Sequence, residues 1–216
     1  MGWLSRTLSS SIGKKTVMAV SGAGLALFVL VHALGNSFAY QGRAALLDYA
    51  GHLHSLGPLV TVFELLLAAA FLIHIGTGLL LFLENRAARP CRYEMHRCRS
   101  ANPLAARTMP YTGLLILALL LVHLLRFRLA PPPLPLPDLL RATLREPAMA
   151  LFYLAGVAAL ALHTSHGLWS LWQSLGLDHP KLTPWLKGGA WGFSLAVAVL
   201  LGLLPLLVLL NPDFLR

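Results

Sequence analysis

The chain has 216 residues, of which 57% are hydrophobic and only 12% are charged, and its mean hydropathy is +0.70. A soluble domain carries roughly twice that share of charged residues, so the composition excludes an ordinary soluble fold and indicates a polytopic helical membrane protein. The net charge of +9 does not point to nucleic acid, because the basic residues gather at the ends of apolar runs, where membrane topology explains them.

Five apolar runs are long enough to cross a hydrocarbon core of about 30 Å as helices. The sequence therefore predicts an all-α fold, a polytopic bundle of five transmembrane helices in a single membrane domain of residues 1–216. The expected helices cover residues 16–37, 58–83, 109–125, 147–175 and 188–210. Small side chains in the first helix permit close contact with a neighbouring helix: Ala19, Ser21, Gly22, Ala23 and Gly24.

The connections carry turn and helix-stop residues. The polar connection of residues 41–57 is expected to be a short surface helix, and Pro131–Pro137 (PPPLPLP) a stiff extended linker that cannot be helical. Gly176 is expected to stop the fourth helix. Four tryptophans near one membrane boundary are expected to form an aromatic belt: Trp169, Trp172, Trp185 and Trp191.

Lysine and arginine residues set the expected orientation. If the N-terminus is cytoplasmic, the inner segments carry 11 of these residues and the outer segments carry 6. This bias favours a cytoplasmic N-terminus and a C-terminus outside.

Four of the five apolar runs contain a histidine deep within the run: His32, His74, His123 and His163. An ionisable side chain within the membrane indicates a functional site, and two neutral imidazoles can bind both faces of a haem. In the expected topology His32 and His123 lie in the outer half of the membrane, whereas His74 and His163 lie in the inner half or near its centre. The simplest pairing is therefore His32 with His123 at an outer haem and His74 with His163 at an inner haem, which gives an electron path across the membrane.

Other interpretations compete with haem ligation. A single histidine in a bundle more often hydrogen-bonds between helices, but four histidines at matched depths favour ligands. His166, one turn after His163, either contacts a haem edge or propionate or is structural. Three side chains of one loop, Cys91, His96 and Cys98, fit no standard zinc pattern, and reduced loop cysteines are expected.

Glu64 lies about two turns inside the outer end of the second helix. It is either a proton acceptor near an outer quinone pocket or a carboxylate that reaches the interface or meets a partner residue. The histidines His52 and His54 of the preceding connection, like His179, are expected to be solvated.

Long stretches of the chain resemble a known family. They are SSSIGKKTVMAVSGAGLALFVLVHALGN, LIHIGTGLLLFLENRAARP, ARTMPYTGLLILALLLVHLL and LHTSHGLWSLWQSLGL. These stretches resemble the dihaem cytochrome b membrane-anchor subunit of succinate dehydrogenase and fumarate reductase, respiratory complex II, in its bacterial single-anchor form. With the fifth helix, the resemblance covers nearly the whole chain.

The resemblance implies cofactors, partners and a location. Two haem b groups are bound by the four histidines in the pairing given above. A flavoprotein subunit and an iron–sulfur subunit attach on the cytoplasmic face of a bacterial cytoplasmic membrane, and electrons pass to a quinone, menaquinone in this branch. The chain would be a subunit of the enzyme without a dicarboxylate site of its own, since nothing here resembles a dinucleotide-binding fingerprint.

The resemblance also implies roles for further residues. Arg107 falls near the expected inner-haem propionates, which a guanidinium suits. The acidic residue that handles protons beside the outer haem in well-studied members has no matching motif here, so the candidates for quinone binding or proton transfer are Glu64, Asp48, His52 and His54. A second acidic residue of some members, two positions before the inner ligand of the fourth helix, is replaced by Ala161, which puts a proton path through that position in doubt.

The basic loop from Arg86 to Arg107 would dock the iron–sulfur subunit, although the same charges also satisfy the inside rule. Two alternatives remain open. The chain could instead be the cytochrome b anchor of a hydrogenase, formate dehydrogenase or nitrate reductase, or a transporter without haem that relays protons through its histidines.

Overall fold

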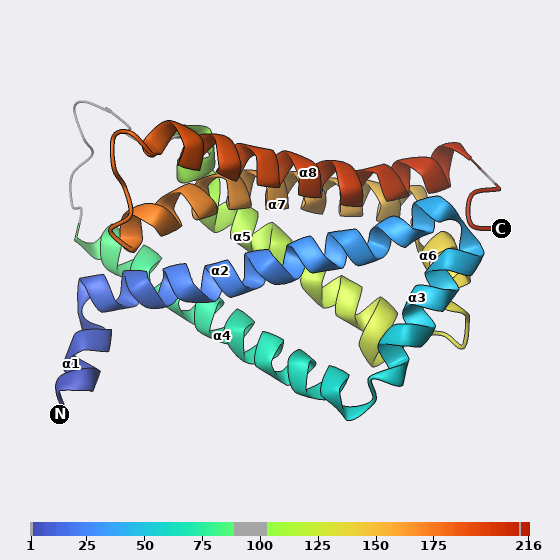
Figure 1. Cartoon of the computed structure of the whole chain (residues 1–216), viewed down its shortest axis with the longest axis horizontal. Coiled ribbons are helices and arrows are strands. Elements are labelled where there is room, and N and C mark those ends of the chain that lie inside the picture. Colours follow the sequence, from blue (N-terminus) through green and yellow to red (C-terminus); the bar gives the residue numbers. More distant parts are fainter. Residues whose placement is uncertain (1, 89–102, 212) are drawn as a thin grey trace.

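A computed structural model describes residues 2–88, 103–211 and 213–216. The regular structure of these residues is helical, and five helices are long and apolar enough to cross a membrane (Figure 1). The long helices are α2 (Ser11–Asn36), α4 (Pro58–Ala87), α5 (Pro103–Leu124), α7 (Pro147–Ser174) and α8 (Thr183–Leu210). The predicted helical class and the predicted number of spanning helices are confirmed.

Five shorter elements join or precede the long helices: α1 (Trp3–Ser9), the 3-10 turn η1 (Ser37–Gln41), α3 (Arg43–Ser55), the π-helical turn η2 (Leu125–Leu129) and α6 (Leu136–Leu144). The predicted surface helix is confirmed as α3. The prediction that Pro131–Pro137 cannot be helical is wrong at its end, because α6 takes Pro137 into its first turn. Proline is tolerated there, since the first N–H groups of a helix have no partner within the helix.

Several helices extend beyond the predicted bounds. Helix α2 begins at Ser11, where the Ser10 side chain accepts a hydrogen bond from the Gly13 amide at 3.0 Å. Helix α4 continues past Glu84 to Ala87, and α8 begins at Thr183 instead of residue 188. An apolar run marks the hydrocarbon layer, and a helix can continue from it into the polar interface. Helix α7 ends just before Gly176, whose φ of 73° suits glycine, as the helix-stop prediction requires.

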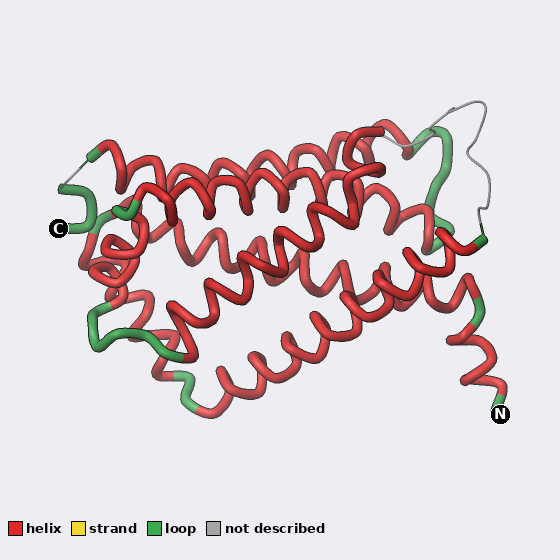
Figure 2. The backbone as a smooth tube through the Cα atoms, turned by 180° about the vertical axis from the view of Figure 1, so that it is seen from behind, coloured by secondary structure: helices red, strands yellow, loops and turns green. Residues whose placement is uncertain are grey.

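The bundle has two distinct ends. We call the end with α1 and the N-terminus the N-terminal end, and the end with α3, α6 and the C-terminus the C-terminal end (Figures 1 and 2). Helix α7 packs against α5, α8 and α2, whereas α4 packs mainly against α2. In both views α4 diverges from α2 and α8 toward the C-terminal end.

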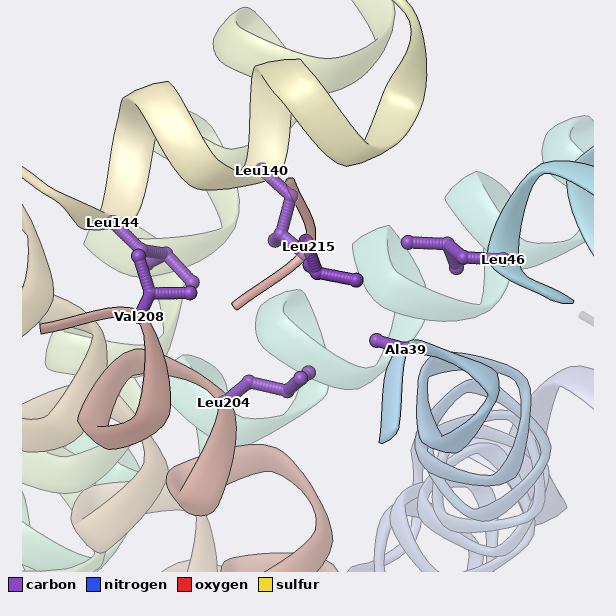
Figure 3. Packing of buried hydrophobic residues seen from close by; sticks show 7 residues of the cluster. All are labelled: Ala39, Leu46, Leu140, Leu144, Leu204, Val208 and Leu215. Carbon is purple, nitrogen blue, oxygen red and sulfur yellow. The ribbon is translucent and has the colours of Figure 1, made fainter. Parts of the chain in front are cut away.

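A compact apolar cluster closes the C-terminal end (Figure 3). Its residues come from η1, α3, α6, α8 and the last turn of the chain: Ala39, Leu46, Leu140, Leu144, Leu204, Val208 and Leu215. Beside it, the Arg43 guanidinium donates to both carboxylate oxygens of Asp138, with Nη2 2.7 Å from Oδ2, and so joins α3 to α6. Burial of apolar surface and a bidentate ion pair thus hold this end together.

Helix α4 is attached differently. None of its 30 residues, all of which the structure describes, is buried. Ion pairs join both of its ends to neighbouring helices: Glu84 pairs with Lys14 of α2, and Glu64 accepts two hydrogen bonds from Arg128 of η2, at 2.7 and 2.9 Å. Among the five long helices, α4 is therefore the one with the least protein around it.

The predicted aromatic belt is only partly correct. Trp185 and Trp191 are 81% and 48% exposed, as residues at a membrane boundary can be. Trp169 is 2% exposed, and the Lys187 ammonium lies 4.9 Å from the centre of its ring. Trp169 is therefore a packing residue between α7 and α8, because it lies on the face of α7 that α8 covers.

Candidate functional site: two histidine pairs

The four intramembrane histidines meet in two pairs, each formed across two helices. His74 of α4 and His163 of α7 have ring centres 6.3 Å apart and planes at 67°. His32 of α2 and His123 of α5 have ring centres 5.7 Å apart and planes at 87°. The predicted pairing of the side chains is therefore what the structure has, and all four rings are partly buried. We call His74–His163 the N-side pair and His32–His123 the C-side pair, after the nearer end of the bundle.

The two pairs lie at different positions along the bundle, because α2 and α5 each contact the N-side pair and contribute a histidine to the C-side pair at well-separated positions. Ser21, which contacts the N-side pair, precedes His32 by 11 residues in α2, and Thr112 precedes His123 by 11 residues in α5. Eleven residues make about three helical turns, so both positions face the same side, about 16 Å apart along the axis. The two pairs are thus stacked along the bundle.

Hydroxyl groups contact the N-side pair. Ser21 Oγ lies 3.2 Å from His74 Nδ1, and Thr112 Oγ1 lies 3.2 Å from His163 Nδ1. A hydrogen bond at one ring nitrogen fixes the ring orientation and leaves the other nitrogen available for a metal.

Aromatic side chains contact the C-side pair. Phe28 stacks on His32 with ring centres 5.4 Å apart, and Phe127 of η2 stacks on His123 at 5.0 Å. Tyr153 of α7 approaches His123 edge-on at 6.2 Å. Phe127 lies in the π-helical turn, four residues after His123, and such turns often occur at functional sites.

Glycines adjoin the N-side imidazoles. A methyl group on Gly22 would lie 3.1 Å from Cε1 of His74, and one on Gly113 would lie 3.6 Å from Cε1 of His163. Gly24, on another face of α2, has open space around it. Gly22 therefore permits close approach of an imidazole, whereas Gly24 has no such contact.

These contacts reveal an internal repeat that the sequence analysis missed. Helix α2 carries Met18, Ser21, Gly22 and His32, and α5 carries Met109, Thr112, Gly113 and His123, at identical spacing. Their partners also match, because glycine follows His74 and His163 by four residues in both α4 and α7. A search for the pattern M-x-x-[ST]-G-x9-H would have identified Ser21 and Thr112 as site residues. Phe28 and Phe127 each lie four residues from a paired histidine, which is the spacing of neighbours on a helix, whereas Tyr153 leaves no comparable signal.

The geometry is compatible with a metal between the two rings of each pair. Metal–nitrogen bonds of about 2 Å on both sides, with about 1 Å from each nitrogen to its ring centre, separate the ring centres by about 6 Å. The observed 6.3 and 5.7 Å agree with this spacing. Iron in haem accepts neutral imidazole as a ligand on both faces. The residues present thus fit a haem at each pair.

The predicted quinone and proton candidates lie apart from one another. Glu64 meets a partner residue, Arg128, as one of its two interpretations required. Asp48 is exposed on α3. His52 and His54, also exposed on α3, direct Nδ1 to carbonyls of their own helix, at 2.8 Å from Asp48 O and 2.7 Å from Ala50 O. These four residues do not form one cluster.

Other candidates lie near the N-terminal end. Arg107 is exposed on α5, and His166 is partly buried one turn after His163 on α7. Among the described residues, no three His, Cys, Asp or Glu side chains converge to hold a metal ion. Cys91, His96 and Cys98, with most of the predicted basic docking loop, lie outside the described residues. The sites that the structure does offer are therefore pairs of imidazoles.

Comparison of the chain with protein-family models, curated proteins and solved structures found no match.

Proposed function

We propose that this chain is the dihaem b membrane anchor of a succinate:quinone oxidoreductase in a bacterial cytoplasmic membrane. It would pass electrons between an iron–sulfur subunit and a quinone, menaquinone in this branch, and tether that subunit and the flavoprotein subunit. The observation that carries the proposal is the pairing of four intramembrane histidines at ring-centre distances of 6.3 and 5.7 Å. The family resemblance of the histidine-bearing stretches supports the choice of complex.

The residues of the chain have distinct tasks in this proposal. Each pair presents one imidazole from either side, and a haem supplies one-electron redox chemistry when bound there. Ser21 and Thr112 orient the N-side rings, and the phenyl rings of Phe28 and Phe127 orient the C-side rings. The stacked pairs, about 16 Å apart along the axis, divide the path between the two ends of the bundle into shorter steps.

The distribution of charge supports an orientation. The bias of lysine and arginine assigns the N-terminal end, with Lys14 and Arg107, to the cytoplasm. The iron–sulfur subunit would then dock on this end, with Arg107 near haem propionates of the N-side pair. The quinone would bind toward the C-terminal end, where Glu64, Asp48, His52 and His54 remain the candidates for proton exchange.

Haem content and redox titration test the proposal. The complex purified in detergent should contain two haem b groups per chain and show two one-electron steps. His32→Ala and His123→Ala should remove the same step, and His74→Ala and His163→Ala the other step. His179→Ala, at an exposed position outside the long helices, is the matched control and should retain both.

Each alternative predicts a different result. If His123→Ala and His163→Ala removed the same step, the pairing would be wrong. Copurification with soluble subunits of a hydrogenase, formate dehydrogenase or nitrate reductase would identify another respiratory cytochrome b anchor. A chain that contains no haem and moves protons across vesicles would be a histidine-relay transporter.

A further inference from the structure

The two histidine pairs share a ligand type but differ in what contacts their rings. We infer that Ser21 and Thr112 are positioning residues that hold each N-side imidazole with Nδ1–H bonded to a hydroxyl and Nε2 free for iron, and that they lower the reduction potential of the N-side haem. The inference rests on the proposed function, because it requires a haem at each pair.

The direction of the hydrogen bond at His74 follows from the single proton of the serine hydroxyl. Ser21 Oγ donates to the carbonyl oxygen of Val17, one turn earlier in α2, at 2.8 Å. That proton is therefore not available to His74, so the contact of 3.2 Å requires Nδ1–H as donor and Oγ as acceptor. In the neutral imidazole, the lone pair then lies on Nε2.

Thr112 repeats this arrangement on the other side of the pair. Thr112 Oγ1 lies 3.1 Å from the carbonyl oxygens of Thr108 and Met109 in its own helix, and 3.2 Å from His163 Nδ1. Thr112 is buried, with 7% of its surface exposed, so protein groups surround this hydroxyl. The same hydroxyl contact thus recurs at both N-side rings, beside a backbone hydrogen bond from His74 to Met18 and from His163 to Met109. The repeat at Ser21–Gly22 and Thr112–Gly113 shows that both helices provide the hydroxyl.

An N–H group that donates to an oxygen makes the opposite nitrogen a stronger base. A more basic ligand favours ferric over ferrous iron, so the reduction potential falls. In the C-side pair the corresponding neighbours are Phe28 and Phe127, whose rings fix orientation by stacking. Within the described part of the chain, hydroxyl contacts of this kind occur only at the N-side rings. The effect should therefore be confined to one of the two haems.

Potentiometric titration of the purified complex tests the inference with Ser21→Ala, Thr112→Ala and the double variant. His74→Ala first identifies which redox step belongs to the N-side pair. We expect the N-side midpoint potential to rise in each variant and most in the double variant, while the C-side potential stays unchanged. Tenfold weaker binding of ferric relative to ferrous iron corresponds to a rise of about 59 mV for a one-electron couple.

Two control variants separate the role in positioning from the loss of any hydroxyl. Thr112→Ser keeps the hydroxyl and should keep the potential of the native protein. Ser170→Ala removes a hydroxyl of α7 that donates to Gly167 O of its own helix, and should also leave both potentials unchanged. Loss of the N-side haem alone in Thr112→Ala, with retention in Thr112→Ser, would also support the inference.

The possible failures are distinguishable. A native protein without haem would refute both the proposed function and this inference. Two haems whose potentials do not respond to either alanine variant, or a shift of the C-side potential, would refute the inference and leave the proposed function standing.

Discussion

Helices α4 and α7 each contribute one imidazole to the N-side pair, but different forces hold them in the bundle. Helix α7 packs against three long helices and buries small residues along its length, among them Ala150, Gly156 and Ala159. Helix α4 buries none of its residues, all of them described, and is joined at its ends by the pairs Glu84–Lys14 and Glu64–Arg128. Packing against three helices thus fixes the position of α7, whereas α4 packs mainly against α2 and depends more on its ion pairs and on whatever His74 binds.

If the proposed haem binds the N-side pair, the largest expected effect is a loss of order in α4 when that haem is removed. A ligand that binds only the assembled helices stabilises that assembly, and α4 has little packing to replace it. In His74→Ala and in His163→Ala we expect faster hydrogen–deuterium exchange in the middle of α4, with α7 unchanged. Mass spectrometry of the purified complex measures both helices in one experiment.

His32→Ala is the matched control for that experiment, because it removes a ligand of the other pair. It should leave exchange near His74 much closer to that of the native protein. Equal exchange in α4 and α7 after loss of the N-side haem would show that the two helices are held alike.

Overpacking should affect the two helices unequally. A methyl group on Gly156 of α7 would lie 2.5 Å from Leu119 Cδ2 of α5, whereas Gly76 of α4 has open space around it. Gly156→Leu should therefore lower the free energy of unfolding by about 1–3 kcal/mol, and Gly76→Leu should lower it by much less. Unfolding of both variants in the same detergent compares them, and an equal loss would contradict the contrast in packing.

Removing the ion pair at one end of α4 should have a smaller effect on stability. The Glu84–Lys14 pair is partly exposed, with 44% and 18% of the two side chains accessible, and such pairs contribute about 0.5 kcal/mol. Glu84→Gln should raise exchange in the last turns of α4 and leave global stability nearly unchanged. A double-mutant cycle with Lys14→Met isolates the interaction between the two side chains. A coupling energy near zero would show that this ion pair does not help to hold α4.

Much of this architecture could be predicted from the sequence, because apolar length and charge determine which segments can cross a membrane. The four deeply placed histidines, on four different segments, and their depths predicted both pairs. The helix ends were predicted less well, since Glu84 and Thr183 continue their helices beyond the hydrocarbon.

The neighbours of the histidines were harder to predict, for physical reasons. The contact of Ser21 with His74 depends on the crossing of α2 and α4, which the hydrophobic pattern of either helix does not specify. By contrast, Phe28 and Phe127 each lie four residues from the histidine that they contact, so helical spacing alone could have predicted these two contacts. Trp169 was predicted to belong to the aromatic belt because the sequence indicates how deep it lies in the membrane, but not which face of its helix another helix covers.

The smallest expected effect concerns an ion pair that belongs to neither α4 nor α7. Hydrogen bonds from the Arg43 guanidinium hold the pKa of the Asp138 carboxyl below its ordinary value of 3.8. The folded chain therefore binds this proton less readily than the unfolded chain. The pair stabilises the fold above pH 3.8, and this contribution is lost as pH falls through the lowered pKa.

Asp138→Asn should accordingly lower the unfolding temperature at neutral pH, and the gap to the native protein should close as the solution is acidified below pH 3.8. Asp213→Asn, which removes the exposed pair with Arg216, is the matched control and should show little gap at any pH. Exchange in α4 should not respond to Asp138→Asn, because the pair joins α3 to α6. Faster exchange in α4 would mean that the packing of the whole C-terminal end also holds α4 in place. The position of α4 would then not be explained by His74 and the two ion pairs alone.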